Sequence, residues 1–128
     1  MPIIRNEDLP TFELPGLVHR TIAGHAQGVS SMEVWHQVMA PGAETPIHRH
    51  ACEEVILVLA GSGRVIVEGE ASDFQANSTL IVPPDLVHQL VNTGSEDMVL
   101  VAALGTAPVR VRTASGEALP VPWQAPGK

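Results

Sequence analysis

The chain has 128 residues and a formal net charge of −7, with 45% hydrophobic and 16% charged residues. This length suits one domain with one core, and the absence of any Lys or Arg cluster argues against nucleic acid and anionic membranes as partners. No apolar run approaches the ~20 residues of a membrane-spanning helix. The single cysteine excludes an intrachain disulfide, so we expect a cytoplasmic protein.

Short strands separated by turns are expected along most of the chain. Eleven Gly and eleven Pro interrupt it, and the pieces between them alternate or run apolar in the manner of strands. The expected strands cover residues 18–23, 29–39, 45–50, 54–60, 63–69, 79–82, 87–92, 97–104 and 108–112. About nine short strands with frequent turns indicate an all-β sandwich or barrel.

The two ends of the chain differ from its middle. Residues 1–17 and 113–128 are rich in proline, so we expect them to lie as arms on the surface of the barrel. The barrel itself is expected at residues 18–112. Neither an internal repeat nor a domain boundary is visible, which predicts a single domain over residues 1–128.

The segment at residues 54–60 is apolar on both faces, whereas a barrel strand of a monomer should alternate. One alternating set would point into the barrel, and it comprises Glu54, Ile56 and Val58. The other set would point outward and need cover, and it comprises Val55, Leu57 and Leu59. A partner subunit or a terminal arm could cover it, and a loop is the alternative. A homodimer is the favoured expectation.

A histidine pair and a glutamate carry the strongest chemical signal. Residues two apart on a strand project to the same face, so His48 and His50 would present two imidazoles together. Glu54 opens the next strand after a tight turn, and His88 is the candidate for a fourth ligand. Three imidazoles and one carboxylate suit Fe, Mn, Ni, Co, Cu or Zn as a divalent ion, and suit Ca or Mg poorly.

The full pattern resembles the cupin superfamily. Its first motif, G-x5-HxH-x3,4-E-x6-G, is matched with every spacing kept by Gly42, His48, His50, Glu54 and Gly61. In its second motif, G-x5-PxG-x2-H-x3-N, the residues in register are Pro83, His88 and Asn92. Both glycines of that motif are replaced, by Asn77 and Asp85. Asn and Asp tolerate best the left-handed backbone that such glycine turns require.

Resemblance to cupins implies a jelly-roll barrel with the metal near its centre, a pocket open at one end, and frequent dimers. On the strand before the first motif, related barrels favour Trp35 and Gln37 as inward residues, which leaves His36 on the outer face. The alternative phase would turn Val34, His36 and Val38 inward. The expected pocket is largely apolar and is formed by Trp35, Gln37, Ile56, Leu90, Leu100 and Ala102.

Two functions of different classes follow from this site. The first is a metal-dependent enzyme acting on a small oxygenated, partly apolar molecule. Dioxygenase chemistry is the preferred expectation for it, and isomerase or lyase chemistry is the next. The second is a non-catalytic protein that binds a metal or a small ligand. Four protein ligands leave about two positions of an octahedral ion open, which serves either function. No acid–base residue beyond Glu54 can be named.

Several polar residues are expected to be peripheral. Cys52 is expected to be a turn residue without a role, the alternative being a reactive thiol near the metal. His19 and His25 are expected on the surface, and Asn92 is expected to tie a turn. Glu53 is expected to be solvated or paired with an arginine, either Arg49 or Arg64.

Overall fold

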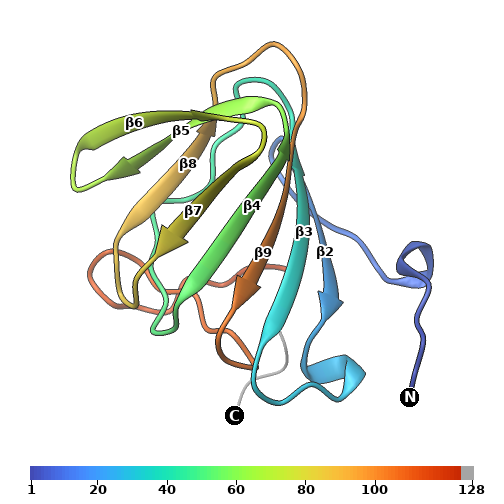
Figure 1. Ribbon diagram of the computed structural model, residues 1–128. Helices are drawn as coiled ribbons and strands as arrows, with labels where there is room; N and C mark the ends of the chain where they lie inside the picture. The colour runs from blue at the N-terminus through green and yellow to red at the C-terminus, as the bar shows by residue number, and fades with distance from the viewer. Residues whose placement is uncertain (125–128) are drawn as a thin grey trace.

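The computed structural model describes residues 1–124 of the chain as nine strands and two short 3-10 turns (Figure 1). In chain order these are η1 (Asn6–Asp8), β1 (Phe12–Leu14), β2 (Leu17–Ala23), η2 (His25–Gln27), β3 (Glu33–Met39), β4 (Glu54–Ala60), β5 (Ser62–Val67), β6 (Glu70–Gln75), β7 (Ser78–Val82), β8 (His88–Asn92) and β9 (Met98–Leu104). Within residues 1–124, no helix has the length and apolar character needed to cross a membrane.

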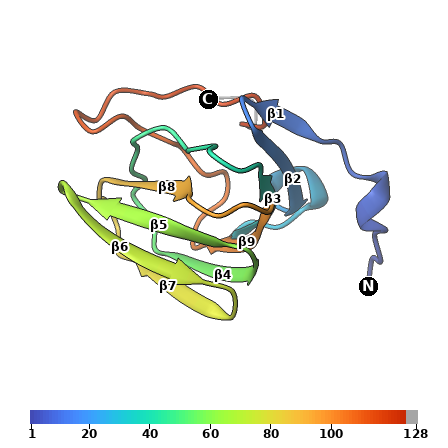
Figure 2. The same cartoon turned by 90° about the horizontal axis from the view of Figure 1, so that it is seen from above.

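The strands form two antiparallel sheets that face each other. The larger sheet has the order β1-β2-β3-β9-β4-β7, and the smaller one has the order β6-β5-β8. Figure 2 shows the smaller sheet against the larger one, with β5 and β6 lying over β4 and β7. This arrangement confirms the expected all-β jelly-roll barrel.

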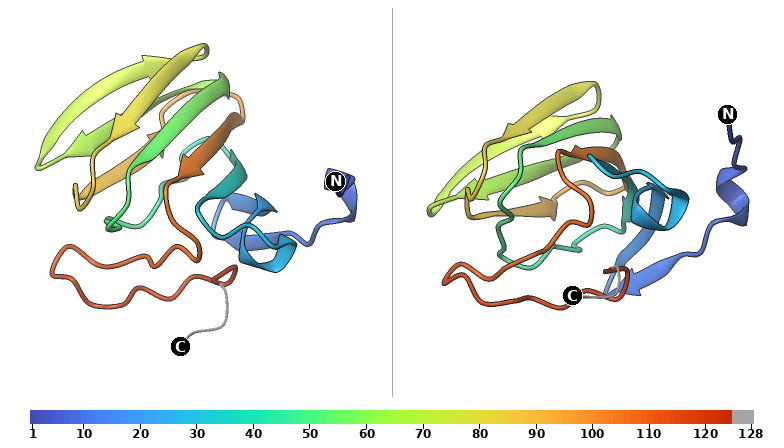
Figure 3. Two further views of the ribbon diagram at one scale, coloured as in Figure 1. Left: turned by 60° about the horizontal axis from the view of Figure 1, so that its bottom comes forward. Right: turned by 90° about the horizontal axis from the view of Figure 1, so that it is seen from below.

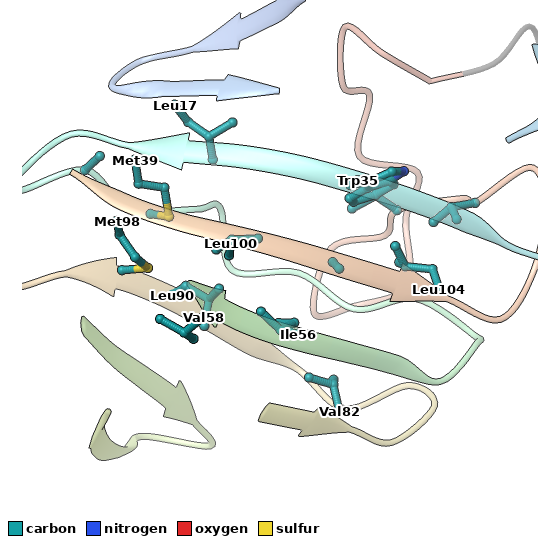
Figure 4. Packing of buried hydrophobic residues seen from close by; sticks show 14 of the residues in the cluster. Leu17, Trp35, Met39, Ile56, Val58, Val82, Leu90, Met98, Leu100 and Leu104 are labelled. Atoms are coloured by element: carbon teal, nitrogen blue, oxygen red, sulfur yellow. The ribbon is translucent and has the colours of Figure 1, made fainter. Parts of the chain in front are cut away.

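The core lies between the sheets and follows the strict alternation of β4 and β9. Inward side chains of these strands are buried, including Ile56, Leu100 and Leu104 (Figure 4). Alternation along a strand sends every second side chain to the opposite face. The outward residues of β4 are accordingly exposed by 39% to 52%, and these are Val55, Leu57 and Leu59. The predicted phase of this strand is therefore confirmed.

Several expected strands differ from the structure. Residues 45–50 and 108–112 form no regular strand, and β3 begins at Glu33. Pro46 removes a backbone donor from the first of these segments, which pairs only through isolated bridges such as His48 with His88. Strands β1 and β6 were not expected. The exposed residues of β6 lack an apolar alternation, and the strand is specified instead by the turn at Glu68 and Gly69, both of which have positive φ.

The two residues that replace the motif glycines adopt the backbone that glycine would. Asn77 has φ of 68° and Asp85 has φ of 63°, both in the left-handed region. The Asp85 N–H donates to the carbonyl oxygen of His50 at 2.8 Å. The replacement thus preserves a turn that holds the segment with His48 and His50 in place.

The segment after β9, residues 109–124, is here called the C-terminal strap. It runs across the open end of the barrel (Figure 3). The Val109 N–H donates to Glu33 Oε2 at 3.0 Å, and Arg112 and Arg49 exchange two backbone hydrogen bonds. The strap thereby closes the same end of the barrel at which the first cupin motif lies.

Candidate metal centre and ligand cavity

Three histidines meet at this end of the barrel. Each of the three residues His48, His50 and His88 has a ring nitrogen within 4.8 Å of a ring nitrogen of the other two. This group could therefore hold a metal ion. His48 and His88 are opposite each other in an antiparallel bridge, which places their ring centroids 4.3 Å apart. His50 follows two residues later on the same side.

Backbone carbonyls orient two of the rings. His48 Nδ1 lies 2.7 Å from the Pro46 carbonyl oxygen, and His88 Nδ1 lies 2.8 Å from that of Leu86. A neutral imidazole that donates from Nδ1 keeps its Nε2 lone pair for a metal. Both rings are therefore held as ligands with Nε2 free.

Glu54, the first residue of β4, lies beside two of these histidines. Its Oε1 lies 3.0 Å from His50 Nε2 and 3.5 Å from His88 Nε2. Despite these distances, Glu54 Oε1 and His50 Nε2 have no hydrogen-bond partner of proper geometry among the described residues, and both are buried. Buried polar atoms without partners are costly. Atoms that converge without bonding to one another fit a shared cation.

Burial and the neighbouring charges of the cluster shift the pKa values of three of its members. Although burial opposes the charge, His50 and His88 beside it lower the pKa of Glu54 to about 2, so the carboxylate is ionised. Burial lowers the pKa of His48 to about 4, aided by neighbouring His88. Burial also disfavours charge on His50, but Cys52 and Glu54 outweigh it and raise the pKa of His50 to about 10. A metal would displace that proton.

A cavity of about 40 Å³ extends from this cluster into the barrel. Five of the six residues expected in the pocket line it, and they are Trp35, Gln37, Ile56, Leu90 and Leu100. Ala102 does not line the cavity. It is opposite Trp35 in the β3–β9 register and is buried in the core, where its single methyl group projects less far than the indole.

Other walls of the cavity come from segments that were expected to be surface arms. Leu14 of β1 lines it, as do Leu119, Val121 and Trp123 of the C-terminal strap. Val111 of the strap also lines it, and this residue was expected within the barrel. The spacing Leu119, Val121, Trp123 is an apolar alternation of period two. Such an alternation indicates one buried face, and this signal could have identified the strap as a wall.

His19 was expected on the surface, and this expectation is wrong. The residue is 0% exposed, and its ring stacks on Trp123 with centroids 3.8 Å apart. Its Nε2 lies 2.7 Å from Thr21 Oγ1 and its Nδ1 lies 3.0 Å from Gln37 Nε2. Burial, with a smaller contribution from His36, lowers its pKa to about 3. A neutral His19 therefore accepts from the Gln37 amide and orients it at the cavity wall.

A buried carboxylate links the sheet to the strap. The Trp35 Nε1–H donates to Glu33 Oε1 at 2.7 Å, and the other Glu33 oxygen accepts the Val109 N–H. Glu33 thus fixes the indole of the cavity wall and the first residue of the strap together.

Among the peripheral residues, Asn92 does tie a turn, because its amide donates to the carbonyl oxygens of Met39 and Glu96. His25 is exposed. Cys52 is a buried free thiol whose sulfur lies 4.0 Å from His50 Nδ1.

The fold and the cluster together define a cupin barrel with a candidate metal centre. Solved structures of low identity share the fold. The polyketide cyclase RemF from Streptomyces resistomycificus superposes with a TM-score of 0.73 at 16% identity, covering 97% of this chain and 89% of that one. An RmlC-like cupin from Shewanella frigidimarina gives 0.69 at 21% identity, covering 82% and 90%. Bacillus subtilis oxalate decarboxylase, described with Mn(II) centres, gives 0.73 at 16%, covering 82% and 29%.

Sequence comparison places the chain within this class. The family model described as auxin binding protein matches residues 1–122, so the chain belongs to the auxin-binding protein family. Auxin-binding protein 1 of Arabidopsis thaliana is 41% identical over 124 residues, which cover 87% of this chain. Auxin-binding protein T85 of Nicotiana tabacum is 40% identical over 126 residues, again 87% of this chain. The chain spans 63% of the Arabidopsis protein and 67% of the tobacco protein.

Proposed function

We propose that the protein binds a small aromatic carboxylic acid, of the auxin type, through a divalent transition metal held by His48, His50, Glu54 and His88. The observation that carries this proposal is the group of unpartnered, buried ligand atoms at one end of an otherwise largely apolar cavity. The family supports it, since its relatives are named for binding auxin.

The donor set suits the metals expected from the sequence. Imidazole and carboxylate ligands bind Fe, Mn, Ni, Co, Cu and Zn ions, and four protein ligands leave room for a carboxylate of the ligand. The metal would supply a positive charge that holds the carboxylate of the acid. In this arrangement Glu54 and the three histidines position the charge, and the apolar walls exclude water from it.

The cavity walls favour an apolar body on the ligand. Thr45 is a polar residue of the cavity wall, but its hydroxyl is used within the protein. It donates to the Pro46 carbonyl oxygen and accepts from the Leu90 N–H. Gln37 keeps part of its amide free after donating to His19. Trp35 and Trp123 offer aromatic surface, and burying apolar area contributes roughly 25 cal/mol per Å².

The size of the cavity implies that the C-terminal strap moves. One buried water needs roughly 10–15 Å³ of cavity volume, so the cavity of about 40 Å³ holds about three waters. An aromatic acid is larger than that. We therefore propose that the ligand enters as Trp123 and the neighbouring strap residues shift outward.

Ligand binding takes precedence over the dioxygenase expectation. The relatives are named for binding, and the described cavity lining offers no acid–base side chain beyond the ligand cluster. We accordingly propose binding without turnover.

A direct test combines metal analysis with calorimetry. Protein purified without added metal is assayed for metal content and then titrated with indole-3-acetate, before and after removal of metal by a chelator. We expect stoichiometric metal, and affinity for the acid that is lost with the metal and restored by its return. Substrate-dependent oxygen uptake would instead support the dioxygenase function. Equal affinity with and without metal would contradict the proposed role of the metal.

We further propose that the protein forms a homodimer through the outer face of its larger sheet. Three rows of outward residues cross that face in register: Val18, Val38 and Val99; His36, Val101, Leu57 and Thr79; Val34, Ala103, Val55 and Ile81. Ile81 is 75% exposed. Glu13 and Arg20 extend the first two rows at the β1–β2 edge. The outward residues on β9, β4 and β7 are uncharged although the chain carries a net charge of −7, so this part of the face favours a second copy by apolar sheet-on-sheet packing.

The dimer is tested by sedimentation of the protein and of Leu57→Glu. The substituted chain should sediment as a monomer at concentrations where the original sediments as a dimer, because two like charges would meet in the apolar face. Ser72→Glu, on exposed β6, adds the same charge away from the face and should leave the dimer intact. A monomeric original chain would contradict the proposal.

We also propose a cytoplasmic location. The chain has one cysteine, and it is buried as a free thiol, which suits a reducing compartment. Fractionation of the native host with an antibody to the protein tests it, and recovery outside the cytoplasm would contradict it.

A further inference from the structure

Two arginines lie directly opposite each other where the C-terminal strap meets the segment that carries His48 and His50. The Arg49 N–H donates to the Arg112 carbonyl oxygen at 2.9 Å, and the Arg112 N–H donates back at 2.8 Å. Opposite residues of an antiparallel pair project to the same side. His48 and Val111 line the cavity, so the alternation turns the two arginines to the outside.

Both guanidinium groups converge on one residue of the strap, Gly116. Arg112 Nη1 donates to the Gly116 carbonyl oxygen at 3.4 Å. A Cβ added to Gly116 would lie 2.7 Å from Arg49 Nη2, so the guanidinium of Arg49 rests against this glycine. Gly116 has φ of 94° in a turn closed by its N–H on the Thr113 carbonyl oxygen. Two positive charges therefore flank the same turn.

These two charges have no anionic partner among residues 1–124. The ion pairs of the described chain involve neither arginine. Arg49 Nε is buried without a hydrogen bond. The sequence offered Glu53 as a partner for Arg49 or Arg64, but Arg64 pairs with Asp73 instead. Like charges placed directly opposite each other are destabilising, and a buried donor without a partner adds to that cost.

We propose that Arg49 and Arg112 form a binding site for a tetrahedral oxyanion, either free phosphate or sulfate or a phosphate monoester. A guanidinium presents paired N–H donors that match such oxygens, and the anion has enough oxygens to serve two guanidiniums at once. Its negative charge would compensate the repulsion between them.

The position of this site gives it a consequence for the cavity. In the sequence, Arg49 lies between His48 and His50 of the candidate metal cluster. Arg112 belongs to the strap, and the residue before it, Val111, lines the cavity. An anion that bridges them would fasten the strap over the cavity. Where the proposed ligand binding holds, the bound oxyanion should slow both entry and release of the ligand.

The site is tested by titrating the metal-loaded protein with inorganic phosphate and with sulfate by calorimetry, at constant ionic strength in chloride. We expect saturable binding that weakens at least tenfold in Arg49→Gln and in Arg112→Gln. Arg64→Gln, which removes an exposed arginine already paired with Asp73, is the matched control and should bind as the original chain does. Binding that persists in both site variants lies elsewhere, for instance on the metal, and would overturn the proposal.

A charge reversal separates the anion site from a merely structural role of the arginines. Arg112→Glu places a carboxylate opposite Arg49, so it should abolish phosphate binding and raise the unfolding midpoint in phosphate-free buffer. A lower midpoint there would contradict the inference that Arg49 lacks compensation. These outcomes do not depend on whether the cavity binds an aromatic acid.

The source of the anion is resolved by a third arm with O-phosphoserine. Binding tighter than that of inorganic phosphate assigns the site to phosphate monoesters, and weaker binding assigns it to the free anion. In either case hydrogen exchange of the Val111 and Leu119 amides should slow as the anion binds, and an unchanged exchange rate would overturn the fastening of the strap.

Discussion

The cavity has two walls of different construction. One wall is the larger sheet, where Trp35, Leu100 and Ile56 project from strands joined by continuous ladders. The other is the C-terminal strap, which is joined to the body by single features such as the Glu33 carboxylate and the Arg49–Arg112 bridge. Elements held by few hydrogen bonds open at low free energy. The larger sheet is therefore the rigid wall, and the strap is the wall that can yield.

The largest expected effect comes from removing a candidate metal ligand that lies on a paired strand of the smaller sheet. His88 is the first residue of β8, and its ring is fixed by the Leu86 carbonyl oxygen. We expect His88→Ala to weaken metal affinity by more than a hundredfold, since losing even a residue that hydrogen-bonds to a ligand costs about 10–100-fold. Metal content after dialysis measures this. His25→Ala changes an exposed histidine and should retain the metal; retention in His88→Ala would contradict the ligand set.

The next largest effect is expected from a substitution in the C-terminal strap. Trp123 stacks on His19 and contacts Trp35 edge to face, so Trp123→Ala should lower the free energy of unfolding by about 2 kcal/mol, below the ~3–5 kcal/mol of a fully buried Trp. It should also speed ligand entry, because the strap loses its largest contact. Urea unfolding and stopped-flow binding measure the two effects. Gln124→Ala, at the neighbouring position, should change neither; a slower entry in Trp123→Ala would show that the strap is not the gate.

Sequence patterns predicted the rigid wall far better than the strap. Glu54, Ile56 and Val58 follow a period of two along one strand, and a ladder converts that period directly into an inward face. His48 and His50 were correctly expected on one side, although Pro46 prevents the regular strand that was expected to carry them. Their alternation survives because single bridges to β8 and to the strap hold it.

The strap could not be predicted in the same way, since its position depends on contacts between distant residues. Val109 is fixed by Glu33, which lies 76 residues earlier, and no local pattern announces that bond. His19 was misplaced for the same reason. Its burial depends on Trp123 at the far end of the chain, and a histidine near a Pro-rich terminus carries no local sign of that partner.

A third effect appears as a pH dependence at the junction of the two walls. The pKa of His19 is lowered by burial to about 3, so the unfolded chain binds a proton near pH 6.5 that the folded chain does not. The contribution of His19 to stability is thus fully present above pH 6.5 and is lost as the pH falls from there toward 3, by at most about 1.4 kcal/mol per pH unit.

His19→Gln isolates this dependence. Urea unfolding at pH 7, 6 and 5 should show a shallower decline for the variant than for the original chain, because carboxylates titrate alike in both. His25→Gln alters an exposed histidine and should leave the decline unchanged. Parallel declines for His19→Gln and the original chain would mean that His19 is already protonated in the fold.

The smallest effect tests how the rigid wall tolerates the replaced glycines. Asn77 lies at φ of 68° before β7, and its N–H donates to the Val58 carbonyl oxygen at 2.8 Å. Asn77→Gly should change the free energy of unfolding by less than about 1 kcal/mol, since glycine adopts this backbone freely but gains entropy in the unfolded chain. Asn77→Ala should cost about 1–2 kcal/mol, because a Cβ without a compensating side chain is strained there. Thermal unfolding of both variants measures the difference. Equal stability of the Gly and Ala variants would mean that the turn relaxes, and that the register of β7 against β4 is set by the strands themselves.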